Sequence, residues 1–257
     1  MTLANYPLLL ILSASLVAIL GASEIGRRYG LRNRNRGRQN ISTLEGSILG
    51  LLALMIGFTF AMALSGFEAR RNAVMYEANA IGTTALRARL LLAPHNQDSV
   101  NLLREYVQVR LDLTQHVLKS KESAAAILRS RALQEALWQQ VKATAAQDNA
   151  MVPTGLYIQA LNAMFDRQEE RHAMLLNRVP NMVLIALYGL AIVASAFAGY
   201  AAGLDSQRSR LPIYTIGVLV AVVIFLIQDI DKPGPGLITV SQQPMIDTAA
   251  FIAGFPD

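Results

Sequence analysis

Residues 45–92 read EGSILGLLALMIGFTFAMALSGFEARRNAVMYEANAIGTTALRARLLL, and this stretch decides the fold. It opens with an apolar run long enough to cross a bilayer, and no proline interrupts it before Pro94. One helix over the stretch would be roughly 70 Å long, against a hydrocarbon core of roughly 30 Å. We therefore expect a helix that crosses the membrane and continues into a water-exposed domain.

One face of this expected helix carries small residues in its membrane half. Steps of four and three residues place six side chains on it: Gly46, Gly50, Ala53, Gly57, Phe60 and Leu64. Small residues allow helices to pack closely in lipid, within a subunit or between subunits. They also leave room for water or an ion, so the same six residues are candidates for lining a pore.

Composition places the chain in a membrane. Of its 257 residues, 53% are hydrophobic and only 16% are charged, against about 25% charged in soluble proteins. The absence of cysteine excludes disulfides, Cys-zinc sites and thiol catalysis. Much of the net charge of +5 comes from arginines beside an apolar span, so the expected partner is the lipid bilayer and not nucleic acid.

The apolar runs predict an all-α integral membrane protein with four transmembrane helices, over 6–23, 44–65, 182–204 and 211–227. Between the second and third spans, helical periodicity dominates. The expected helices there are the continuation to Leu92 and those over 99–118, 122–146 and 154–179. They predict a four-helix extramembrane bundle inserted between the two pairs of spans.

Four regions follow from this interpretation. Residues 1–65 hold the first transmembrane pair with an Arg-rich loop, and 66–180 the helical domain. Residues 181–229 hold the second pair, and 230–257 form a polar, turn-rich tail with a short extended piece at 237–241.

Charge predicts the orientation. The two short loops carry eight arginines: Arg27, Arg28, Arg32, Arg34, Arg36, Arg38, Arg208 and Arg210. Because arginine-rich short loops stay in the cytoplasm, both termini and the helical domain are expected outside it. The predicted location is a bacterial inner membrane.

Five charged residues flank the second span: Glu45, Glu68, Arg70, Arg71 and Glu77. Repeated around a homo-oligomer, they could concentrate ions at a pore mouth. The alternative is ordinary pairing along one helix, for example of Glu68 with Arg71.

Patterns for catalysis, cofactors and metals are missing from the sequence. The single E-x-x-H, at 169–172, lacks the second copy that a di-iron bundle needs. Neither a Ser-His-Asp arrangement nor a phosphate-binding glycine loop can be assigned. We expect no enzyme activity and no cofactor.

Several segments together resemble a known family: LLALMIGFTFAMA at 51–63, FEARR at 67–71, EANAIGTTALR at 77–87, LREYVQVRLDL at 103–113 and DIDKPGPGLITVSQQPM at 229–245. The sequence is similar to bestrophin-like domain proteins of bacterial membranes. The residues that carry the family motifs are Asn79, Gly82, Thr83, Asp231, Lys232 and Pro233. The tail motif usually reads Leu-Asp-Arg-Pro in that family, and here Ile230 and Lys232 replace its first and third residues.

The resemblance implies a channel. Bestrophins are anion channels built as rings, in which the second membrane helix lines a narrow neck and continues into a large cytosolic domain. It therefore implies an oligomeric channel for ions, with the conduit lined by the second helix. The alternative is a membrane-anchored extracytoplasmic sensor or scaffold, although the sequence contains no signalling output module.

Overall fold

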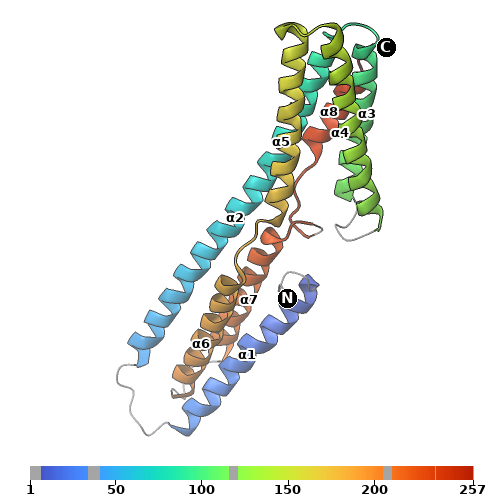
Figure 1. Cartoon of the computed structure of the whole chain (residues 1–257). Coiled ribbons are helices and arrows are strands. Elements are labelled where there is room, and N and C mark those ends of the chain that lie inside the picture. The colour runs from blue at the N-terminus through green and yellow to red at the C-terminus, as the bar shows by residue number, and fades with distance from the viewer. Residues whose placement is uncertain (1–6, 34–40, 116–120, 205–209, 235, 257) are drawn as a thin grey trace. The chain divides into compact units, whose positions relative to one another are not determined.

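The computed structural model describes residues 7–33, 41–115, 121–204, 210–234 and 236–256 (Figure 1). Every regular element in these ranges is a helix, which confirms the all-α prediction. The predicted Arg-rich loop falls partly on residues 34–40 and the second short loop on 205–209, both outside the described residues.

The helices follow in chain order: α1 Leu8–Arg32, α2 Ile41–Ala88, α3 His95–Gln115, α4 Lys121–Gln147, the short π-helical η3 Met151–Gly155, α5 Leu156–Leu176, α6 Asn181–Leu204, α7 Leu211–Asp231 and α8 Gln243–Ala253. Among the described residues, four helical stretches are long and apolar enough to span a membrane by length and composition: Leu8–Arg32, Thr43–Ala88, Met151–Leu204 and Leu211–Asp231. They confirm the four expected spans.

Helix α2 is one continuous helix of 48 residues, as predicted. It ends at Ala88, four residues before the expected end. There the amides of Leu90 and Leu91 donate to carbonyls three residues back, which tightens the last turn.

The helix expected over 154–179 is shorter in the structure. Helix α5 ends at Leu176, and α6 begins at Asn181. Asn177 is extended, with ψ 113°. Pro180 disfavours a helical conformation of the residue before it, so the third span does not continue α5 as an unbroken helix.

The chain forms two compact units. One contains residues 1–67 and 178–238 and is called the membrane unit below. The other contains residues 68–177 and 239–257 and is called the bundle unit.

In the membrane unit, α1 and α6 touch through their backbones. Each helix carries a Gly-x-x-x-Gly pair, Gly26 with Gly30 and Gly199 with Gly203. A Cβ added at Gly199 would lie 2.0 Å from the carbonyl oxygen of Ser23. Glycine at these positions is therefore what lets the two helices approach.

The bundle unit has one core, to which α2, α3, α4, α5 and α8 contribute. Among its fully buried side chains are Ile81, Leu103, Leu137, Leu161 and Met245. All four helices expected in this region contribute buried residues to the core, and α8 is a fifth helix that the four-helix prediction did not include.

Helix α8 is not among the helices predicted from the sequence. The tail was expected to be polar and turn-rich, with an extended piece at 237–241, but those residues form bends and irregular chain and a helix follows. Met245, Ala249 and Ile252 on α8 are buried in the bundle core. Their spacing of four and three residues is the signal that could have revealed the helix.

Candidate functional site

The predicted pore-lining face of α2 is exposed in the single chain. All six of its residues, Gly46, Gly50, Ala53, Gly57, Phe60 and Leu64, are exposed. A Cβ added at any of its three glycines would meet no atom within 4 Å. The small residues of this face therefore do not serve close packing within the subunit.

A different face of α2 packs within the membrane unit. Leu52, Thr59 and Ala63 are buried, and Leu52 and Ala63 join a core with residues of α1, α6 and α7. Thr59 satisfies its hydroxyl by donating to the Met55 carbonyl at 2.7 Å. Packing of the chain onto itself thus leaves the small face open.

The five charges predicted for a pore mouth separate into two groups. Glu68 and Arg71 are exposed, and Glu45 is half-buried. Arg70 and Glu77 are buried, and Arg70 donates through Nη1 to the Asn177 carbonyl at 3.5 Å. Buried charges are not available to ions at a mouth, so we do not propose this role for Arg70 or Glu77.

Glu77 instead holds two arginines inside the bundle unit. Arg110 of α3 donates through Nε to Glu77 Oε1, and Arg171 of α5 donates through Nη1 to Glu77 Oε2, each at 2.6 Å. Arg171 Nη2 also donates to Gln242 Oε1 at 3.0 Å, just before α8. The exposed fractions are 0% for Glu77, 9% for Arg110 and 6% for Arg171, so this is a buried charge cluster joining α2, α3, α5 and the segment before α8.

Electrostatics within the cluster favour the charged form of Arg110. Burial alone would lower the pKa of Arg110, but the Glu77 carboxylate beside it raises that pKa above its ordinary value. The pKa of the neighbouring Tyr106 is also raised, to about 12, but there the main cause is burial of the phenol. Its hydroxyl lies 3.1 Å from Gln168 Oε1 and stays protonated near neutral pH.

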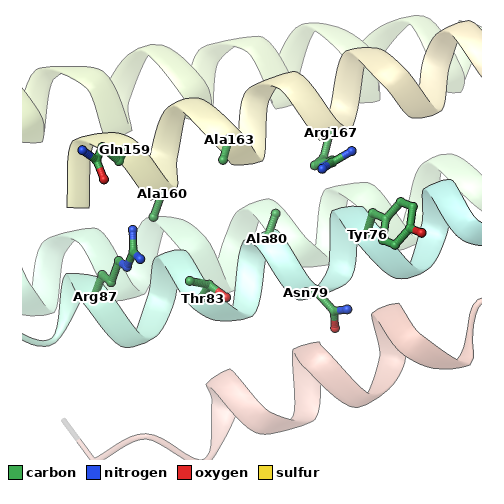
Figure 2. A pocket seen from close by; sticks show the side chains of 9 residues that line it. All are labelled: Tyr76, Asn79, Ala80, Thr83, Arg87, Gln159, Ala160, Ala163 and Arg167. Carbon is green, nitrogen blue, oxygen red and sulfur yellow. The ribbon is translucent and has the colours of Figure 1, made fainter. Parts of the chain in front are cut away.

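Apart from Glu77, the residues of the EANAIGT motif lie in two places: beside α8 and in a groove on the bundle unit. Gly82 is half-buried on α2, and a Cβ there would lie 3.8 Å from Cγ2 of Thr248 in α8. Thr248 donates to the Ala78 carbonyl at 3.3 Å. Asn79 and Thr83 are exposed and line a groove between α2 and α5 (Figure 2).

This groove has a volume of about 320 Å³. Figure 2 shows Arg87 and Gln159 at one end, Tyr76 and Arg167 at the other, and alanines between them. Neither arginine was predicted to be a site residue from the sequence. No local pattern could have revealed them, because Arg87 and Arg167 belong to different helices.

The tail motif forms the turn that follows α7. Asp229 is fully buried and accepts hydrogen bonds from the amides of Leu237 at 2.9 Å and Ile238 at 2.8 Å. Asp231 is also buried and accepts from the Val179 amide at 2.9 Å. Lys232 is half-buried and Pro233 buried. The two carboxylates therefore fix the backbone of Val179, Leu237 and Ile238.

Within the described ranges, no three His, Asp or Glu side chains are grouped so that they could hold a metal ion. His172 of the E-x-x-H is exposed on α5.

Four apolar helices, a charge-poor composition and an α2 longer than a bilayer define a multi-pass integral membrane protein. The model of the bestrophin-like domain family matches residues 13–245, so the chain belongs to that family.

Two solved structures share the fold, both crystal structures of single-substitution variants of a bacterial bestrophin homologue from Klebsiella pneumoniae. The first has a TM-score of 0.69 at 14% identity, covering 96% of this chain and 99% of that one. The second has a TM-score of 0.66 at 15% identity and covers 95% of each chain. Among curated proteins, none matches this sequence.

Proposed function

We propose that the protein is an oligomeric ion channel whose conduit is lined by α2. The observation that carries the proposal is the exposed face Gly46 to Leu64, which the chain's own helices leave uncovered. Membership of the bestrophin-like family supports it. One helix cannot enclose a pathway, so the proposal requires a ring of identical subunits.

The order of residues along the face gives the conduit its shape. Gly46, Gly50, Ala53 and Gly57 leave room for a hydrated ion. Phe60 and Leu64 follow one and two turns later and form an apolar constriction, where dewetting controls passage. Glu68 and Arg71 lie just beyond, both exposed, and act as the charges at that mouth.

Current through a planar bilayer that contains the purified full-length protein tests the proposal. We expect discrete current steps above the leak of the protein-free bilayer. Current indistinguishable from that leak, across chloride, sodium and potassium salts, would contradict it.

We also propose that the helical domain lies outside the cytoplasm of a bacterial inner membrane, because the short loops carry the arginine excess. Bestrophins have their large domain in the cytosol, which is the opposite orientation to the one proposed here. The chain lacks cysteine, and single cysteines can therefore report the side. Ala132→Cys in the bundle unit and Leu31→Cys at the end of α1 both lie at exposed positions.

A membrane-impermeant maleimide added to intact cells (spheroplasts if an outer membrane is present) should label Ala132→Cys and leave Leu31→Cys unlabelled until permeabilisation. The reverse pattern would place the helical domain in the cytoplasm and refute this orientation.

A further inference from the structure

The groove between α2 and α5 has cationic side chains and enough volume for a small molecule. Its lining includes two arginines, whose guanidinium groups bind anions, and no carboxylate, since the Glu170 carboxylate that pairs with Arg167 lies outside the lining (Figure 2). Its volume of about 320 Å³ is at the lower end of the range of small-molecule sites, roughly 300–1,000 Å³. All of its lining residues belong to the bundle unit.

Both arginines are held in place at the groove. Arg87 donates through Nη1 to the Leu156 carbonyl at 2.8 Å. The Arg167 guanidinium lies 5.2 Å from the centre of the Tyr76 ring, and its Nη1 donates to Glu170 Oε2 at 2.6 Å. A guanidinium held through one nitrogen keeps further N–H donors, which suit the planar oxygens of a carboxylate or the oxygens of a phosphate.

The floor of the groove makes room for a ligand. Ala80 of α2 faces Ala160 and Ala163 of α5, as Figure 2 shows, so small side chains line the space between the two cationic ends. Gln159 and Thr83 add neutral hydrogen-bonding groups beside it.

We propose that this groove is a binding site for a small soluble organic anion bearing a carboxylate or phosphate group, with Arg87 and Arg167 as its anchors. The site concerns the bundle unit alone and does not depend on the proposed channel activity. Its experiment therefore succeeds or fails whether or not the protein conducts ions.

Isothermal titration of the full-length protein in an uncharged detergent tests the site, with succinate and inorganic phosphate as separate probes. We expect saturable binding of at least one probe. Arg87→Gln and Arg167→Gln should each weaken that binding roughly tenfold or more, because each removes a charge-assisted hydrogen bond.

Two further variants distinguish binding in the groove from nonspecific attraction of anions to the positively charged surface. Ala163→Leu keeps every charge but fills the floor, and it should abolish binding. Arg131→Gln removes an exposed arginine of α4 outside the groove and should leave binding unchanged.

Three results with these probes and variants would overturn the proposal. They are absence of saturable binding of either probe, equal weakening by Arg131→Gln and Arg167→Gln, and unchanged binding in Ala163→Leu. Binding confined to short-chain phosphatidylglycerol in the same titration would assign the groove to a lipid headgroup and would also refute it.

Discussion

Replacing Glu77 by glutamine is expected to destabilise the protein by about 3–5 kcal/mol. The substitution keeps the shape of the side chain but removes the single carboxylate that Arg110 and Arg171 share. Both arginines are more than nine-tenths buried, so water cannot replace the lost partner. Thermal or denaturant unfolding of the purified protein, followed by circular dichroism, measures the loss.

Glu105→Gln is the matched control. Glu105 pairs with Arg129 on the surface of the same unit, where the two side chains are 44% and 57% exposed. An exposed pair of this kind contributes about 0–1 kcal/mol. A second variant, Glu77→Gln with Arg171→Gln, removes one uncompensated charge and should recover part of the loss. If Glu77→Gln unfolds like Glu105→Gln, the buried charge cluster does not stabilise the bundle.

Gly199→Ala is expected to separate α1 from α6. The new Cβ would lie 2.0 Å from the Ser23 carbonyl oxygen and 2.8 Å from its carbon. Both are backbone atoms, so no flexible side chain can move aside and the helices themselves must shift. Overpacking of this kind costs about 1–3 kcal/mol or more, and it also removes the close backbone contact that holds helices together in lipid. The melting temperature in detergent should fall by several degrees.

The same helix supplies the control for this substitution. Gly189→Ala lies on α6 where an added Cβ meets nothing within 4 Å, and it should melt at or above the temperature of the wild type. Gly26→Ala and Gly21→Ala form the equivalent pair on α1, with 2.0 Å to the Ala196 oxygen at Gly26 and open space at Gly21. Equal melting of Gly199→Ala and Gly189→Ala would show that the contact is not required.

Much of the fold could be predicted from the lengths of the apolar runs and from the helical spacing of apolar residues. Apolar runs of membrane length gave the four spans, and the absence of proline before Pro94 gave the long α2. Helix α8 was not predicted because the prolines and glycines over 233–236 indicate a turn-rich tail, although Met245, Ala249 and Ile252 have helical spacing.

Side-chain partners were harder to predict than helices. The sequence marked Glu77 as a charge near a membrane boundary, but its partners Arg110 and Arg171 are 33 and 94 residues away. The Gly-x-x-x-Gly pair at Gly46 and Gly50 was compatible with two roles, helix packing and pore lining. In the structure, the glycine pairs of α1 and α6 make the close helix–helix contact. A Cβ added at Gly46 or Gly50 would meet no atom within 4 Å.

The exposed small face of α2 is the centre of the proposed function, and cysteine modification under voltage tests it most directly. Gly57→Cys lies on the face in open space, whereas Leu51→Cys is exposed on a different side of the same helix. In planar bilayers containing each full-length variant, a charged methanethiosulfonate reagent should block the current of Gly57→Cys. It should leave the currents of Leu51→Cys and the cysteine-free wild type unchanged. Block at Leu51→Cys with none at Gly57→Cys would contradict a conduit lined by this face.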